Sequence, residues 1–151
     1  MKKEEIMSIL KLAVQKEINA HDFYTKAASK VKDKSVQQLF EELAQDELQH
    51  RQTLEKFIES EVTNLDFKPV LDYKVADTVE HPEPTLDMSF VEAVALSMKH
   101  EQDAMDMYTG LSVISIDEDV KNLFHSLANM EQVHKTKLEE LYNNVAFAEQ
   151  W

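Results

Sequence analysis

The chain has 151 residues, a formal net charge of −13 and no cysteine. This length suits one domain with one core, and the missing cysteines exclude disulfides, thiolate metal sites and cysteine nucleophiles. The charge argues against nucleic acid and anionic membrane surfaces as partners, because nothing basic is clustered. No apolar run is long enough to span a bilayer, and the N-terminus lacks the apolar core of a signal peptide, so a cytoplasmic location is expected.

The composition predicts an all-α protein. One glycine and three prolines are too few turn residues for a sheet protein of this length. The apolar period predicts four helices, over about residues 3–31, 34–60, 88–114 and 117–146. Asp33 and Asp117 stand at two very short junctions, where an aspartate can cap free backbone N–H groups. We therefore expect a single domain, 1–151, made of two antiparallel helical hairpins, 3–60 and 88–146.

A linker containing all three prolines, Pro69, Pro82 and Pro84, separates the hairpins over residues 61–87. Helices of the predicted length run to roughly 40 Å at ~1.5 Å per residue. About 25 linker residues can span that distance, since extended chain covers up to ~3.3 Å per residue. The third helix can therefore start at either end of the bundle, and a long crossover is compatible with the sequence. A short C-terminal tail follows residue 146.

The two halves of the chain look like copies of one another. Adding 84 to a position in the first half often returns the same residue, and no gap is needed. The pairs include Leu12 and Leu96, Glu17 and Glu101, Tyr24 and Tyr108, Phe40 and Phe124, Glu47 and Glu131, and His50 and His134. Helical patterning alone would repeat the leucines but not Glu, Tyr and His in one register. An internal repeat and a pseudo-two-fold bundle follow.

Charged residues occupy the apolar seams of all four predicted helices. Glu47 and His50 fall at consecutive seam positions of the second helix, in the four-and-three spacing of a packed face. The other inward-pointing residues of this kind are Glu17, Glu101, Glu131 and His134. Each buried charge costs several kcal/mol, so the four carboxylates need protons or metal cations. Two divalent cations balance four glutamates, whereas one cation leaves two negative charges.

The Glu-x-x-His spacing places both side chains within ~60° of each other on one helix face, so they can address the same site. Two such motifs in repeat register, each with a matching seam glutamate, predict a site for two metal ions. Oxygen and nitrogen ligands suit iron or manganese, and zinc would also bind. The alternative interpretation is a buried polar network without metal.

The pattern of these residues resembles the ferritin-like di-iron carboxylate superfamily, and within it the rubrerythrin-like proteins, over about residues 3–146. The resemblance rests on Glu17 with Tyr24, Glu47 with His50, Glu101 with Tyr108, and Glu131 with His134. It implies a ferritin-like four-helix bundle, with the two helical hairpins joined by a long crossover, whose two irons react with peroxide or dioxygen in oxidative-stress defence. By analogy, Glu47 and Glu131 would bridge the two metals, and Glu17 and Glu101 would be terminal ligands. His50 and His134 would each complete the ligand set of one metal.

The chain departs from rubrerythrins in two respects. They usually carry an extra glutamate three residues after the third-helix ligand, where this chain has Ala104. They also carry a rubredoxin domain with four cysteines, so this cysteine-free chain would need an external electron-donor protein. Two other functions stay open: iron handling by ferroxidation, storage or delivery, and a structural bundle in which metal only holds the fold. A homodimer is expected.

The sequence also contains tyrosines and histidines outside the six seam positions. Tyr24 and Tyr108 lie two turns after Glu17 and Glu101, so each is either hydrogen-bonded to a ligand carboxylate or an ordinary core tyrosine. His21 flanks the inner face and is expected to stay outside the site. The histidines expected at the surface are His81, His100 and His125.

Overall fold

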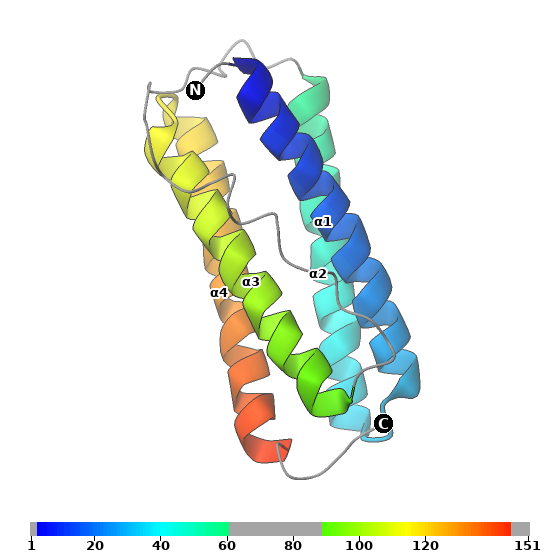
Figure 1. The fold of residues 1–151 in the computed structure, drawn as a ribbon. Coiled ribbons are helices and arrows are strands. Elements are labelled where there is room, and N and C mark those ends of the chain that lie inside the picture. The colour runs from blue at the N-terminus through cyan, green and yellow to red at the C-terminus, as the bar shows by residue number, and fades with distance from the viewer. Residues whose placement is uncertain (1–2, 61–88, 146–151) are drawn as a thin grey trace.

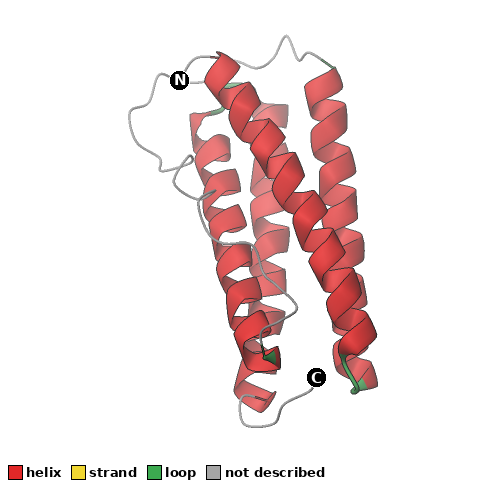
Figure 2. Cartoon of the chain, turned by 45° about the vertical axis from the view of Figure 1, so that its right-hand side comes forward, coloured by secondary structure: helices red, strands yellow, loops and turns green. Residues whose placement is uncertain are grey.

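The protein is a bundle of two helical hairpins (Figure 1). The computed structural model describes residues 3–60 and 89–145. The four helices are α1 (Lys3–Lys30), α2 (Lys34–Glu59), α3 (Phe90–Ile114) and α4 (Glu118–Val145). α1 packs mainly against α2, and α3 packs mainly against α4. Figure 2 shows the helices lying alongside one another with no strand in the described ranges, as an all-α protein requires.

Aspartate caps close the two short junctions. Asp33 Oδ1 accepts hydrogen bonds from the N–H groups of Ser35 and Val36 at 2.8 and 3.1 Å. Asp117 Oδ1 accepts one from the N–H of Val120 at 3.1 Å. These bonds satisfy donors that the first helical turn leaves free. The observed helix boundaries agree with the predicted ones to within two residues.

The end of α2 and the start of α3 lie at opposite ends of the bundle. α2 ends at the upper end of the bundle in Figure 1, and α3 begins at the lower end. α2 and α3 therefore run parallel, and the connection between Glu59 and Phe90 joins opposite ends of the bundle, as the crossover topology requires. The predicted linker 61–87, with His81, and the C-terminal tail lie outside the described residues.

Two apolar clusters fill the ends of the bundle. One lies where α1 and α4 begin and α2 and α3 end, and it includes Leu10, Leu54, Leu111 and Phe124. The other lies at the opposite helix ends and includes Phe40, Leu43, Phe90 and Leu138. Burying one such side chain contributes about 1.5–3 kcal/mol, so the fold is stabilised from both ends and a polar middle layer is tolerated. None of the four described helices is long and apolar enough to cross a membrane.

Candidate metal centre

Six polar side chains are buried in the middle layer, between the two apolar clusters. They are the residues that the seams predicted: Glu17 from α1, Glu47 and His50 from α2, Glu101 from α3, and Glu131 and His134 from α4. None is more than 2% exposed. The helical phase therefore brings all six into the interior, and the packing of the two hairpins brings the two halves of the set together.

Oxygen and nitrogen atoms of these side chains form two overlapping groups. The first group is Glu17, Glu47, His50 and Glu131, and the second is Glu47, Glu101, Glu131 and His134. Within each group, one potential ligand atom per residue lies within 4.8 Å of the others. Glu47 and Glu131 belong to both groups, and the offset of 84 residues exchanges one group for the other. This is an arrangement suited to two neighbouring cations.

Both imidazoles turn Nδ1 toward the carboxylates. His50 Nδ1 lies 2.8 Å from Glu131 Oε1 and 3.6 Å from Glu17 Oε2. His134 Nδ1 lies 3.3 Å from Glu47 Oε1 and 3.4 Å from Glu101 Oε2. The two rings are stacked with their centroids 6.0 Å apart. Each ring therefore offers one nitrogen to its own group and leaves Nε2 to face the surrounding protein.

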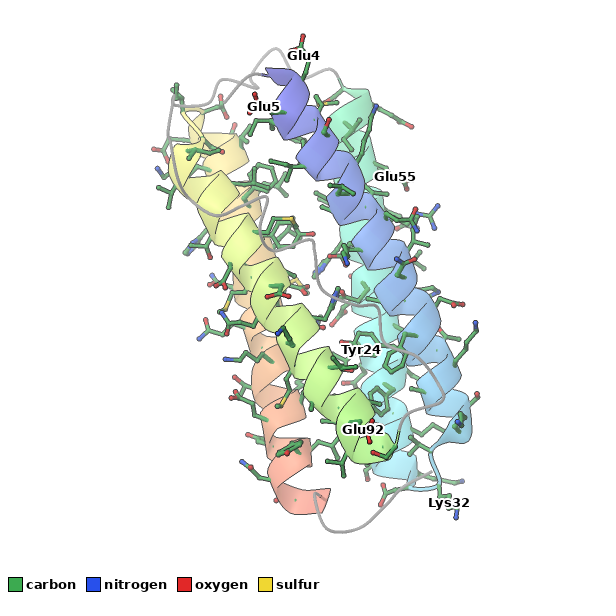
Figure 3. The ribbon with its side chains drawn as sticks, in the orientation of Figure 1. Glu4, Glu5, Tyr24, Lys32, Glu55 and Glu92 are labelled. Carbon is green, nitrogen blue, oxygen red and sulfur yellow. The ribbon has the colours of Figure 1, made fainter. Side chains whose placement is uncertain are left out.

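Two tyrosines connect the hairpins across the centre. The Tyr24 hydroxyl donates to Glu101 Oε1 at 2.8 Å, and the Tyr108 hydroxyl donates to Glu17 Oε1 at 2.9 Å. Figure 3 shows Tyr24 directed into the space between the hairpins. Of the two alternatives for these tyrosines, the hydrogen bond to a carboxylate is the one present, and each tyrosine reaches the glutamate of the other hairpin. The exchange obeys the repeat, because the two donors and the two acceptors are each 84 residues apart.

Several buried carboxylate oxygens lack a hydrogen bond. Among the described residues, Glu47 and Glu131 have both oxygens in this state, while Glu17 and Glu101 have only Oε2. A buried polar atom without a partner costs about 1–3 kcal/mol, and more if it is charged. So many unpaired oxygens beside two imidazole nitrogens fit a set of ligands for divalent cations. The side chains present therefore suit the metals that the sequence predicted.

The same crowding changes the proton affinity of the metal-free centre. Burial, followed by the neighbouring Glu47 charge, raises the pKa of Glu17 to about 8. Burial and the Glu101 charge raise the pKa of Glu131 well above its usual value. Burial lowers the pKa of His134, but the Glu101 and Glu47 carboxylates beside its Nδ1 outweigh burial and raise it to about 11. Protons therefore offset part of the buried charge until cations displace them.

Two residues at the margin of the centre were missed by the sequence analysis. Asp46 Oδ2 lies 2.8 Å from His134 Nε2, so the imidazole donates to a carboxylate outside the six. The expectation that His100 is a surface residue is wrong: its side chain is 13% exposed, and Nε2 lies 3.6 Å from Glu47 Oε2. His100 is turned ~100° from Glu101 on α3, yet an imidazole is long enough to reach the buried Glu47 from there. Its position directly before a seam glutamate was the available signal.

The other two described histidines lie as expected. His21 Nδ1 lies 2.8 Å from the Ala44 carbonyl oxygen, and His21 belongs to neither group of ligand atoms. His125 is exposed on α4. The centre therefore contains both predicted ligand histidines, His50 and His134, with His100 at its edge.

Comparisons with known proteins agree with this fold. The sequence matches the rubrerythrin family over residues 8–142. A hypothetical protein from Pyrococcus furiosus has the same fold, with a TM-score of 0.73 and 24% identity, over 99% of this chain and 97% of that chain. A Thermotoga maritima protein, proposed in its structure's description to be a ferritin-like diiron-carboxylate protein, gives a TM-score of 0.72 and 20% identity, over 95% of both chains. No curated protein matches the sequence.

The solved structures identify the fold as a ferritin-like four-helix bundle. The family match and the buried Glu/His cluster together indicate a site for two metal ions.

Proposed function

Because the chain belongs to the rubrerythrin family, we propose that its buried centre binds two iron ions and that the loaded site reduces peroxide or dioxygen. One metal would be held by Glu17 and His50, and the other by Glu101 and His134. The two glutamates shared by both groups of ligand atoms would bridge the metals. Four carboxylates and two neutral imidazoles balance two divalent cations, so the loaded centre would carry no net charge.

The distribution of free carboxylate oxygens carries the proposal. A bridging carboxylate needs both oxygens, and both are without hydrogen bonds in Glu47 and Glu131. A terminal ligand needs only one, and Glu17 and Glu101 each keep Oε2 free while a tyrosine hydroxyl holds Oε1. The two tyrosine bonds thus support a division into two bridging and two terminal ligands that was expected from the family resemblance alone.

Two bound ferrous ions would supply the two electrons that convert one hydrogen peroxide and two protons into two waters. The chain's own residues orient and shield the centre. The tyrosine hydroxyls fix the terminal carboxylates, and the apolar clusters at both ends keep bulk water out of the middle layer. Because the chain contains no cysteine, the electrons that restore the centre would come from a separate donor protein.

The test is stopped-flow mixing of the anaerobic, Fe²⁺-loaded protein with hydrogen peroxide or dioxygen. We expect two irons per chain and oxidation at least about tenfold faster than that of free Fe²⁺. Glu47→Gln removes a shared ligand and should lose both properties. Glu41→Gln is the matched control, because Glu41 is exposed on the same helix. Oxidation no faster than that of free Fe²⁺, or equal rates in wild type and Glu47→Gln, would refute the redox function.

The alternative functions predict different results. Iron storage requires a large hollow assembly, which a sizing column would detect, and the same column tests the expected homodimer. A structural metal predicts that Glu47→Gln sharply lowers the melting temperature and that no redox reaction occurs. Elemental analysis of protein isolated anaerobically would distinguish iron from manganese and zinc.

A further inference from the structure

The two halves of the centre differ just outside the six shared side chains. Asp46 Oδ2 accepts a hydrogen bond from His134 Nε2 at 2.8 Å. Adding 84 to 46 gives 130, so Met130 occupies the position of the second copy of Asp46. Both positions lie at the margin of the bundle, with the Asp46 side chain 32% exposed and Met130 37% exposed. The repeat therefore replaces the Asp46 carboxylate beside His134 with the Met130 thioether, on the helix that faces His50.

The two imidazoles differ accordingly. His50 Nε2 is buried and has no hydrogen-bond partner among the described residues, whereas His134 Nε2 has a carboxylate partner. A thioether is only a weak acceptor, so Met130 cannot replace that partner. A carboxylate on the far nitrogen fixes the tautomer and the ring orientation, and it raises the basicity of the nitrogen that faces the metal. In His134 that nitrogen is Nδ1, which already points at Glu47 and Glu101.

We propose that Asp46 makes the two metal positions unequal, so that the position beside His134 binds a divalent metal more tightly and fills first. This inference rests on the two-metal site proposed above. Loss of an outer hydrogen-bond partner typically costs 10–100-fold in metal affinity. Asp46 is partly exposed, so we expect a difference near the lower end of this range, about tenfold.

The inequality has a consequence for the proposed redox reaction. Reduction of one peroxide takes two electrons and therefore two ferrous ions. Filling of the weaker position beside His50 would then decide whether the centre can reduce peroxide. At limiting metal the protein would hold one ion beside His134 and stay inactive. Asp46 is thus a positioning residue that acts through His134, and metal supply would regulate the activity through the second position.

Cobalt binding tests the inequality without relying on activity. Co²⁺ is titrated into the metal-free full chain against a competing chelator, and crystals grown with one equivalent are measured by anomalous scattering. We expect two binding steps about tenfold apart, and a cobalt peak beside His134 that exceeds the peak beside His50. Equal steps with equal peaks, or a stronger peak beside His50, would overturn the inference.

Three substitutions at the two repeat-related positions provide an internal control. Asp46→Ala should weaken the tighter step about tenfold, leave the weaker step unchanged and equalise the two anomalous peaks. Asp46→Asn retains an acceptor oxygen without the charge, so it should restore part of the difference. Met130→Asp should tighten the weaker step, a gain that damage to the fold cannot produce.

Equal weakening of both steps by Asp46→Ala, with a lower melting temperature, would mean a merely structural role and would also overturn the inference. Failure of the wild type to bind any cobalt at the centre would overturn the proposed function as well. Two equal sites would contradict only the inequality.

Discussion

The hydroxyl groups of Tyr24 and Tyr108 should contribute directly to the stability of the bundle. Tyr24→Phe and Tyr108→Phe each remove one oxygen from a ring that is almost completely buried. The ring contacts remain, since Tyr24 stacks on Phe40 at 5.9 Å and Tyr108 stacks on Phe124 at 6.4 Å between centroids. Any change in the free energy of unfolding therefore reports the hydrogen bond across the hairpins and not the packing.

The magnitude depends on the charge of the acceptor. With metal bound, the ligand carboxylates are ionised, and a hydrogen bond to a charged group contributes about 1.5–3 kcal/mol. Without metal, burial and Glu47 raise the pKa of Glu17 to about 8, so this carboxyl keeps its proton near neutral pH. A bond between neutral groups contributes only about 0.5–1.5 kcal/mol. Tyr108→Phe, which affects Glu17, should therefore cost more in the loaded protein than in the metal-free protein.

The assay is urea unfolding followed by far-ultraviolet circular dichroism near neutral pH, with and without saturating Co²⁺. Tyr142→Phe is the matched control, because Tyr142 is a partly buried tyrosine of α4 that packs against the apolar cluster beyond the centre. Losses below about 0.5 kcal/mol in both loaded variants would refute the reasoning. So would a loss in Tyr142→Phe as large as theirs.

Three further outcomes follow from the structure. The stability of the metal-free protein should fall as the pH rises from about 5 to 8, by up to about 1.4 kcal/mol per unit, because folded Glu17, with its pKa raised from 4.5 to about 8, keeps a proton that the unfolded chain loses. Folded His134, with its pKa raised from 6.5 to about 11, also keeps a proton that the unfolded chain loses above pH 6.5, so it lowers stability in the same direction. A melting temperature that rises between about pH 5 and 8 would contradict these protonation states. Removing either cap with Asp33→Ala or Asp117→Ala should cost about 0.5–2 kcal/mol in urea unfolding, and no loss in both would exclude capping as the reason the helices begin there. Phe124→Ala should cost about 3–5 kcal/mol, whereas Leu12→Ala, at a side chain 45% exposed, should change the same free energy by less than about 0.5 kcal/mol.

The sequence predicts best those residues whose direction depends only on their own helix. Glu47 and His50 occupy seam positions, and helical geometry alone turns them inward whatever the neighbouring helices do. The repeat then located their copies, and all six side chains meet in the middle layer. The helix boundaries were predicted for a similar reason, since the caps at Asp33 and Asp117 are local interactions.

Contacts between helices could not be predicted in this way. The linker length allowed α3 to start at either end of the bundle, and the structure shows it starting at the far end. Tyr24 was placed correctly on the inner face, but its acceptor is Glu101 in the other hairpin. Asp46 and His100 stand at the edges of the seams, and which edge faces the centre depends on how the hairpins dock. A helical period in a single sequence carries no information about that docking.

The positions that are identical in both halves of the repeat and those that differ have different physical meanings. The copied glutamates and histidines place unpaired oxygens and nitrogens around two equivalent positions, which would lower stability unless cations occupy them. The uncopied neighbours are next to these ligands: Asp46 corresponds to Met130, and His100 corresponds to Lys16. Because the two groups contain the same ligand types, a difference in affinity between the two proposed metal positions would be expected to originate in surrounding residues such as these. Asp46 acts on one imidazole only, whereas His100 lies against Glu47, which both groups share. Asp46 is therefore placed to affect the position beside His134 alone, and His100 is placed to affect both positions.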